Sequence, residues 1–141
     1  MHFSVHVAPW GEFEAEARAV REAVFIKEQK VPLELEWDAM DAGCVHVVAR
    51  DQTGAAIGTG RLLPDGRIGR VAVLSTWRGR GVGRSMLQTL IAEARRRGFA
   101  EAVLSAQTQA RQFYEKNGFA VAGEAFMEAG IPHVSMVRKL T

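Results

Sequence analysis

The chain has 141 residues, enough for one domain with a buried core, and we expect residues 1–141 to form that single domain. Its apolar content of 48% and charged content of 24% are those of a globular protein. The net charge of +2 is too small to predict a nucleic-acid partner, and the single cysteine excludes a disulfide framework. We find no apolar run long enough to cross a membrane and no secretory signal, so we expect a cytoplasmic protein.

The charges are distributed unevenly along the chain. Residues 1–41 hold nine acidic and four basic side chains, a net charge of −5, and the remainder carries +7. One part of the protein could therefore suit a cationic ligand and the other an anionic one. The alternative is that most of these charges form a solvated surface.

The first elements of the chain follow from its apolar periodicity. Residues 2–8 alternate between apolar and polar, which predicts a half-buried strand. From Glu12 the apolar spacing becomes that of a helix, and residues 28–41 are acidic and interrupted by Pro32, which indicates an ordered loop or a short helix. The helical positions predicted to face the core are Phe13, Ala17, Val20 and Val24.

Three strands are predicted next, over residues 44–50, 55–63 and 67–74. The turns between them have the expected chemistry, because Asp-Gln-Thr-Gly and Pro-Asp-Gly favour tight reversals. Glycine inside a strand often marks a bulge or a close approach of another element. The glycines inside these strands are Gly58, Gly60 and Gly69.

The second half of the chain begins with its clearest helix, which ends at Gly98. A strand over 100–106, a short helix over 108–117 and two closing strands over 119–126 and 133–140 complete the order. The result is a mixed α/β domain without an internal repeat. The apolar stripe of the long helix consists of Val82, Met86, Leu87, Leu90, Ile91 and Ala94.

The segment RGRGVGR, residues 78–84, joins a strand to this long helix. Glycines before a helix N-terminus let free N–H groups and the positive end of the helix dipole approach an anion, and arginines add bidentate donors. We therefore predict a phosphate or pyrophosphate site. The Walker and dinucleotide patterns do not fit, because Arg84 or Met86 stands where they need their last glycine. A tight turn without a ligand is the alternative.

Two segments carry a resemblance to a known family. VAVLSTWRGRGVGRSML, residues 71–87, resembles the pyrophosphate-binding segment of the GCN5-related N-acetyltransferases, whose pattern is [QR]-x-x-G-x-[GA]. QARQFYEKNGF, residues 109–119, resembles that family's helix after the fifth strand. Residues 21–41, together with LSAQTQARQFYEKNGF and the later AGIPHVSM, are similar to the small bacterial YjcF/ElaA-like branch.

The resemblance implies an α/β (α+β mixed) fold. We expect a mixed, mostly antiparallel sheet of about seven strands, with helices on both faces and a splay between strands 4 and 5. It also implies a coenzyme A site, in which Tyr114 protonates the departing thiolate as general acid. The implied cofactor-binding residues are Val71, Ala72 and Val73 for pantetheine, Arg78, Gly79, Arg80, Gly81, Val82, Gly83, Arg84 and Ser85 for pyrophosphate, and Gln107.

The chain departs from the family pattern at two positions. Gly69 stands where many members carry a glutamate that acts as base, and Gln107 stands where an asparagine often opens the tyrosine helix. A base is needed because an alkyl amine is almost fully protonated at neutral pH. The candidates for the base are Glu28, Glu36, Asp38, Asp41, His46 and His133, and those expected at the acceptor are Glu28, Glu36, Asp38 and His133.

The function that these features predict is acetyl-CoA-dependent N-acetylation of a small amine or of a protein amine. We expect acetyl-CoA as cosubstrate, no metal, no nucleic acid, no membrane and a possible homodimer. The alternative is an acyl-CoA-binding regulatory domain with weak or lost catalysis, which the missing carboxylate at Gly69 motivates. Two finer alternatives also stay open: Tyr114 as a packed aromatic residue, and residues 28–41 as a solvated loop rather than the wall of an acceptor pocket.

Overall fold

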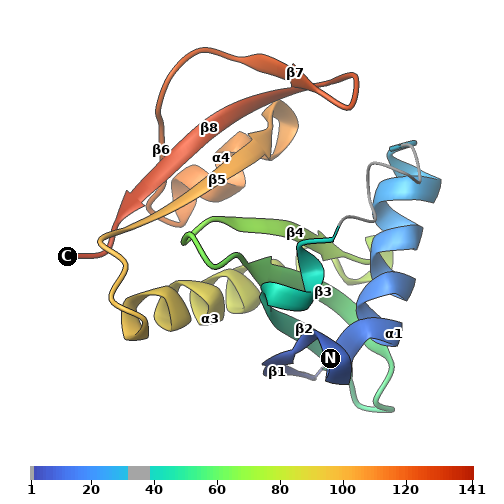
Figure 1. The fold of residues 1–141 in the computed structure, drawn as a ribbon. Coiled ribbons are helices and arrows are strands. Elements are labelled where there is room, and N and C mark those ends of the chain that lie inside the picture. The colour runs from blue at the N-terminus through green and yellow to red at the C-terminus, as the bar shows by residue number, and fades with distance from the viewer. Residues whose placement is uncertain (1, 32–38) are drawn as a thin grey trace.

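Figure 1 shows the fold in a computed structural model, which describes residues 2–31 and 39–141. The strands are β1 (Phe3–Pro9), β2 (Val45–Asp51), β3 (Ala56–Leu62), β4 (Ile68–Val73), β5 (Glu101–Gln107), β6 (Ala120–Val121), β7 (Phe126–Glu128) and β8 (Ile131–Lys139). The helices are α1 (Trp10–Arg21), its wider π-type continuation η1 (Glu22–Glu28), α3 (Val82–Arg96) and α4 (Arg111–Lys116), with short 3-10 turns η2 (Asp41–Gly43), η3 (Ser75–Trp77) and η4 (Thr108–Ala110).

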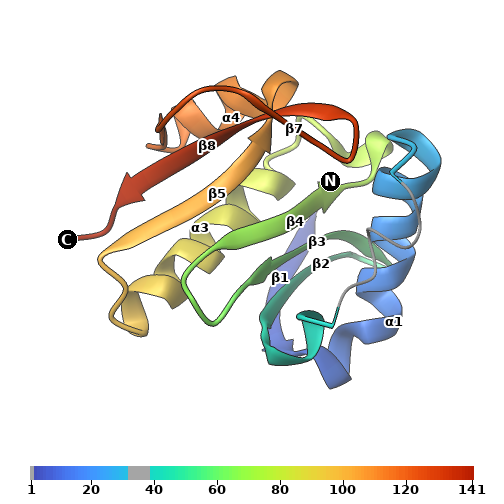
Figure 2. The same cartoon turned by 45° about the horizontal axis from the view of Figure 1, so that its top comes forward.

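The strands form two sheets that meet at β4 and β5. The first sheet has the order β1-β2-β3-β4, and in the second β8 pairs with β5, β6 and β7; every pair within a sheet is antiparallel. In the described residues, one parallel bridge between Arg67 and Val103 joins β4 to β5. Figure 2 shows these two strands running in the same direction. The predicted mixed, mostly antiparallel architecture is confirmed.

The last part of the chain differs from the prediction. The single strand expected over 119–126 is divided into β6 and β7, which pair with opposite ends of β8. Gly123 lies between them with φ +109°, a conformation that L side chains rarely adopt, so the chain leaves the sheet at this point. The described residues therefore form eight strands rather than about seven.

One face of the first sheet packs against α3. All six residues of the predicted apolar stripe of this helix are buried. The glycines of β3 explain how closely the helix approaches, because a Cβ added at Gly58 would lie 2.8 Å from Met86 Cε, and one at Gly60 would lie 3.1 Å from Leu90 Cδ1. The prediction that these glycines mark a close approach is confirmed.

The other face of the sheet packs against α1 and η1. The four helical positions predicted to face the core are buried, and Val20 and Val24 pack against Ala72 of β4. Helices thus cover both faces, as the sequence predicts. The arrangement also places the end of α1 next to the edge where the two sheets meet.

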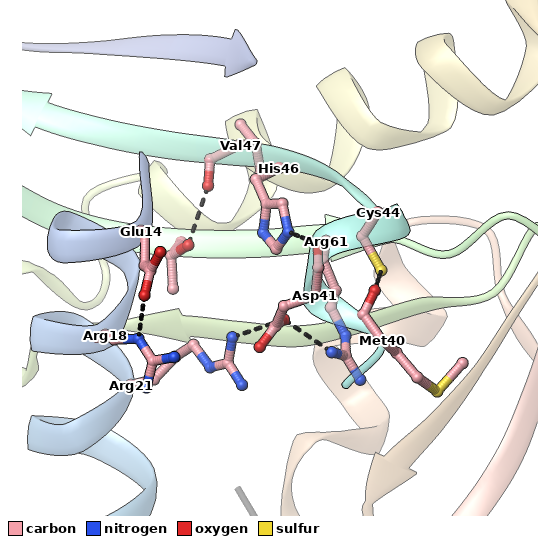
Figure 3. A network of polar contacts seen from close by, with 10 residues as sticks. Glu14, Arg18, Arg21, Met40, Asp41, Cys44, His46, Val47 and Arg61 are labelled. Atoms are coloured by element: carbon pink, nitrogen blue, oxygen red, sulfur yellow. Dashed lines mark hydrogen bonds and ion pairs between the residues drawn. The ribbon is translucent and has the colours of Figure 1, made fainter. Parts of the chain in front are cut away.

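A buried polar cluster closes the α1 face (Figure 3). The Oδ1 atom of Asp41 accepts hydrogen bonds from Arg21 Nη1 at 2.9 Å and from Arg61 Nη1 at 2.8 Å. His46 donates from Nε2 to the backbone oxygen of Asp41 at 2.9 Å, and its ring lies 4.6 Å from the ring of Trp10. The Asp41 carboxylate, which both arginines bind, holds η2 against α1 and β3.

Candidate active site

A cavity of about 510 Å³ lies between the two sheets and the end of α1. Four parts of the chain line it. η1 and the residues after it contribute Phe25, Gln29, Val31 and Met40, and β3, β4 and their connection contribute Arg61, Leu63, Arg67, Ile68, Gly69, Arg70 and Val71. β5, η4 and α4 contribute Leu104, Ser105, Ala106, Gln107, Ala110 and Tyr114, and the β7–β8 region contributes Glu128, Ala129, Ile131 and His133. This volume is typical of small-molecule sites.

The end of α1 is shaped to contribute to this cavity. Its last turns are wider than those of an α-helix, with hydrogen bonds from Gln29 N to Val24 O at 2.9 Å and from Val31 N to Phe25 O at 2.8 Å. Such π-type turns are frequent at functional sites because they change the direction of side chains. Here they bring Phe25, Gln29 and Val31 to the cavity wall.

The strand β4 carries the residues expected to contact pantetheine. Val71 lines the cavity and packs with Val73 against the α3 side of the core, while Ala72 is buried against α1. Their backbone pairs with β3 on one side only. On the other side, the described part of the chain gives β4 no strand partner past the bridge at Arg67, so its N–H and C=O groups face the gap toward β5.

β4 also contains a bulge next to the cavity. Thr59 pairs with Ala72 and Arg61 pairs with Gly69, so β4 has one residue more than β3 between these pairs. Arg70 lies in this bulge with φ +52°, an unusual conformation for a residue that is not glycine. Bulges next to active sites redirect side chains, and here the bulge brings both Arg70 and Val71 to the cavity wall.

The glycine-arginine loop forms the N-terminus of α3. Gly79 and Gly81 have φ values of +74° and +85°, and a Cβ at either position would meet no atom within 4 Å. The helix begins at Val82 without a side-chain cap, so its first N–H groups are available to an anion. The side chain of Val82 is buried in the core, so only its backbone can serve a ligand.

The arginines of this loop differ in their contacts. Arg78 forms a bidentate ion pair with Glu28, with distances of 2.7 and 2.8 Å, and donates from Nε to Val73 O at 3.1 Å. Arg80 lies over the ring of Trp77 at 5.7 Å, and Arg84 is exposed on the first turn of α3. The expected phosphate ligand Arg78 and the expected acceptor residue Glu28 are therefore partners of each other in this structure.

Tyr114 lies on α4 and lines the cavity. Its ring packs edge-on against Phe113 and Phe119, with ring centres 5.0 and 6.0 Å away. In the part of the chain that the structure describes, its hydroxyl has no hydrogen-bond partner. Burial raises the pKa of Tyr114 to about 12, so the phenol remains protonated at neutral pH. It packs as an aromatic residue and also presents a proton donor to the cavity.

Gln107 ends β5 and also lines the cavity. Its amide donates to Gln29 Oε1 at 2.6 Å, and its own oxygen accepts from the amide of Gln109. Gln107 thereby connects the second sheet to the end of α1 across the cavity. This bridge holds the two sides of the site together.

The structure separates the candidates for the base. Glu28 is paired with Arg78, whose guanidinium lowers the pKa of the Glu28 carboxyl, and Asp41 is buried between two arginines. His46 is buried against Trp10, and burial lowers the pKa of its imidazole. None of these three lines the cavity. Glu36 and Asp38 lie outside the described residues.

His133 is the described candidate that does line the cavity. Its Nδ1 donates to Ile131 O at 2.7 Å, which leaves Nε2 as the proton-accepting nitrogen in the neutral ring. Nε2 lies 3.4 Å from Glu128 Oε2, and the ring stacks on Phe126 with centres 6.0 Å apart. An imidazole that is fixed in this way can accept a proton from a group placed beside it.

Sequence reasoning did not identify several residues of the cavity. The side chains that it missed are Phe25, Gln29, Arg61, Arg67, Arg70, Ser105 and Glu128. Phe25 and Gln29 reach the cavity through the π-type turns of η1, Ser105 through the pairing of β5 with β8, and the others through the pairing of β3 with β4 and of β7 with β8. The periodicity of a single segment carries no signal for that pairing.

Two features are absent from the described ranges, 2–31 and 39–141. No three His, Cys, Asp or Glu side chains there are grouped as metal ligands would be. No helix in those ranges has both the length and the apolar character that crossing a bilayer requires.

Comparison with known proteins identifies the family of the chain. Residues 13–140 match the acetyltransferase (GNAT) domain family. The chain is 41% identical to the uncharacterized N-acetyltransferase YjcF of Bacillus subtilis over 123 residues, which cover 84% of this chain and 87% of YjcF. An acyl-CoA N-acyltransferase from Pseudomonas aeruginosa has a similar structure, with a TM-score of 0.85, 28% identity and coverage of 97% and 99% of the two chains.

Escherichia coli ElaA has the same fold, with a TM-score of 0.87, 24% identity and coverage of 98% of this chain and 100% of ElaA. At that identity the likeness concerns the fold alone. The family match covers almost the whole chain, and YjcF is similar over most of its length. The chain therefore belongs to the GNAT acetyltransferases, in agreement with the resemblance of its glycine loop and tyrosine helix.

Proposed function

We propose that the protein transfers the acetyl group of acetyl-CoA to a primary amine. The observation that carries this proposal is the cavity between β4 and β5, with Tyr114 in its wall and the glycine loop at the end of β4. A thioester donor such as acetyl-CoA needs three features of its site. An unpaired strand edge binds its amides, a helix N-terminus binds its phosphates, and a protonated phenol meets its departing sulfur.

The donor would be held mainly by backbone groups. The free edge of β4 at Val71 to Val73 offers N–H and C=O groups to the pantetheine amides, as an added strand would use them. The N–H groups from Gly79 to Ser85 would bind the pyrophosphate, with Arg84 supplying charge beside them. The two left-handed glycines fit this role, because no side chain blocks the approach of a phosphate.

Tyr114 would protonate the sulfur of coenzyme A. Its pKa of about 12 keeps it in the acid form over the whole neutral range. Burial penalises a thiolate as it penalises a phenolate, so the pKa of a thiol beside Tyr114 is raised as well. The departing thiolate can therefore take up a proton from this phenol.

His133 would accept a proton from the amine. Its Nδ1 is occupied by Ile131 O, and Nε2 is directed toward Glu128 within the cavity wall. An ammonium that binds between Nε2 and the Glu128 carboxylate loses one proton to His133 and becomes nucleophilic. The N–C bond then forms as the C–S bond breaks. One proton of the ammonium leaves through His133 to solvent. Tyr114 gives its proton to the sulfur, and the second proton from the nitrogen restores the phenol.

A second candidate function has its own supporting observation. Gly69 lines the cavity, and no side chain stands there to act as the expected strand carboxylate. A domain that binds acyl-CoA without turning it over would have such a site. The two functions differ in the release of free thiol, because only the enzyme releases it continuously when an amine is present.

The test is thiol release from acetyl-CoA with a panel of primary amines. We expect steady turnover, and a loss of about 100-fold in kcat for Tyr114→Phe with unchanged affinity for acetyl-CoA. Ser105→Ala removes a hydroxyl from the same cavity wall and should change kcat less than about threefold. Binding of acetyl-CoA without thiol release by any amine would favour the binding domain instead.

The role of His133 has a separate test. His133→Gln should lower kcat/KM for alkyl amines by about 100-fold near pH 7, because the ammonium then lacks its proton acceptor. An aniline, which is already neutral at that pH, should lose much less. An equal loss for both amines would show that His133 supports the structure and is not the base.

A further inference from the structure

Tyr114 lies on a helix that is too short to fix its own position. α4 has six residues, Arg111–Lys116, and isolated helices of this length do not persist in water. The place of Tyr114 in the cavity is therefore set by the contacts that α4 makes with other elements. Two of these contacts join α4 and the residue after it to α3, the helix that follows the glycine-arginine loop.

The first contact lies at the first turn of α3. A Cβ added at Gly83 would lie 3.3 Å from Cζ of Phe113, so the ring of Phe113 packs against the backbone of α3 at this glycine. Val73, at the end of β4, is also close, with its Cγ2 3.6 Å from the same added Cβ. The helix that carries Tyr114 therefore meets α3 directly beside the glycine-arginine loop.

The second contact is a pair of side-chain amides, Asn117 and Gln88, more than one turn further along α3. Asn117 directly follows α4 and is buried, with 7% of its surface exposed. Its Nδ2 donates to the Phe113 carbonyl at 2.8 Å, and its Oδ1 accepts from Gln88 Nε2 at 3.1 Å. Because a carbonyl oxygen only accepts hydrogen bonds, the contact with Phe113 fixes which end of the Asn117 amide faces Gln88.

Asn117 is also held by the second sheet. Its backbone oxygen accepts a hydrogen bond from Nη1 of Arg138 on β8 at 2.9 Å. A Cβ added at the neighbouring Gly118 would lie 3.2 Å from Arg138 Nε, so the arginine lies against a turn that has no side chain there. One buried residue thereby joins α3, α4 and β8.

The end of α4 does not require all of these bonds. The backbone N–H groups of residues 117–119 satisfy the last carbonyls of the helix, at distances of 3.0 to 3.1 Å. The contact of Asn117 Nδ2 with the Phe113 carbonyl belongs to the same cap. The contact of Oδ1 with Gln88 reaches another helix instead, and its effect is to fix the position of α4 relative to α3.

We propose that Asn117 is a positioning residue of the reaction, which holds Tyr114 at a fixed place relative to the N-terminus of α3. The inference rests on the proposed acetyl transfer, in which one donor molecule has its pyrophosphate at the glycine-arginine loop and its sulfur at Tyr114. A shift of α4 along α3 would move the phenol away from the sulfur, and proton donation depends on that alignment. Asn117 is not among the described residues that line the cavity, so it acts through Tyr114.

The experiment uses the full chain and removes the amide pair from either end. Asn117→Ala deletes the buried amide, and Gln88→Met deletes only the donor on α3 while it keeps a side chain of similar length. Gln112→Met makes the same exchange at an exposed position of α4 and is the control. Each variant is studied at a temperature well below its unfolding midpoint, so that the folded fraction is the same.

Thiol release is measured for each variant with Tyr114 present and with Tyr114→Phe. With Tyr114 present, we expect kcat to fall about tenfold in Asn117→Ala and about threefold or more in Gln88→Met. In the Tyr114→Phe background the same changes should lower kcat less than about twofold, because the group that they position is absent. Gln112→Met should change kcat less than about twofold in both backgrounds.

The tyrosinate absorbance gives a second readout that needs no turnover. Tyr114 is the only tyrosine in the chain, so this absorbance reports it alone. Loss of the amide pair should let water reach its hydroxyl, and the pKa of Tyr114 should fall from about 12 toward its ordinary value of about 10 in Asn117→Ala and in Gln88→Met. In Gln112→Met this pKa should stay at about 12.

The inference would be overturned by equal losses of kcat in the two backgrounds, which would show that Asn117 supports only the fold. It would also be overturned by a Tyr114 pKa that is unchanged in both Asn117→Ala and Gln88→Met, or that Gln112→Met lowers equally. Should Asn117→Ala fail to fold, Gln88→Met decides both measurements. If no amine releases thiol, the proposed function fails separately, and the absorbance titration alone decides the inference.

Discussion

At the scale of single residues, Tyr114 offers a direct physical test. It is the only tyrosine in the chain, so the tyrosinate absorbance reports this residue alone. We predict a pKa of about 12 in the folded protein, against about 10 in the unfolded chain. Tyr114 keeps its phenol proton to a higher pH in the folded state than in the unfolded state. The free energy of unfolding should therefore fall as the pH rises from about 10 to about 12.

The control for this titration is Tyr114→Phe. The variant lacks the ionising group, so its free energy of unfolding should fall less steeply over the same pH interval. A tyrosine pKa near 10 in the folded protein would mean that the hydroxyl of Tyr114 is solvated, and the burial that we describe for it would be wrong.

The carboxylate of Asp41 is the second residue with a large predicted effect. Asp41→Asn leaves Arg21 and Arg61 buried without the negative charge that they share, and we expect a loss of about 3 kcal/mol or more in the free energy of unfolding. Denaturant unfolding measures it. Glu14→Gln removes an exposed carboxylate paired with Arg18 and should cost less than about 1 kcal/mol. Similar costs for both would contradict the buried cluster.

At the scale of elements, the ion pair of Arg78 with Glu28 joins η1 to the glycine-arginine loop. If Arg78 binds pyrophosphate, it must exchange this partner for the ligand. An exposed ion pair contributes about 0–1 kcal/mol, so Glu28→Gln should tighten the binding of coenzyme A by up to about fivefold, measured by calorimetry. Glu22→Gln, at the start of η1, is the control and should have no effect. Weaker binding in Glu28→Gln would show that the pair holds the loop in its binding form.

The packing of α3 on β3 depends on glycine. A Cβ at Gly60 would lie 3.1 Å from Leu90, 3.3 Å from Val47 and 3.4 Å from Val71, so Gly60→Ala should lower the free energy of unfolding by about 1 kcal/mol or more. At Gly69 an added Cβ meets nothing within 4 Å, and Gly69→Ala should be neutral or slightly stabilising. Equal effects of the two substitutions on thermal unfolding would contradict this packing.

The elements also show what a sequence can predict. The helical spacing of Phe13, Ala17, Val20 and Val24, and the stripe of α3, led directly to the buried faces. The break between β6 and β7 was not predicted, because the positive φ of Gly123 and the pairing of each piece with β8 depend on tertiary contacts.

The residues of the candidate site also fall into two groups, those that local sequence patterns predict and those that depend on tertiary contacts. The glycine loop before α3 and the helix that carries Tyr114 follow from local patterns, since both are encoded in consecutive residues. Arg70 and Glu128 do not, because a bulge and a register decide which strand residues line a cavity. Glu28, one of the expected acceptor residues, is paired with Arg78, and Glu36 and Asp38 lie outside the described residues, so the expected acidic wall stays a prediction.

At the scale of the whole molecule, two sheets share one boundary, and the cavity lies there. α3, which follows the glycine-arginine loop, packs on one face of the first sheet, and α1 and η1 pack on the other (Figure 1). Tyr114 and His133, the residues that we propose as proton donor and proton acceptor, both line this cavity.

The most direct test of this account is calorimetric titration of the protein with acetyl-CoA, with ATP and NAD as controls. The account predicts binding of acetyl-CoA with a Kd on the order of micromolar and much weaker binding of both controls, since they lack pantetheine for the β4 edge. Equal affinity for ATP would show that the glycine-arginine loop binds phosphates and that the free edge of β4 adds nothing to the affinity. No binding of acetyl-CoA would contradict the donor site and the acetyl transfer that depends on it.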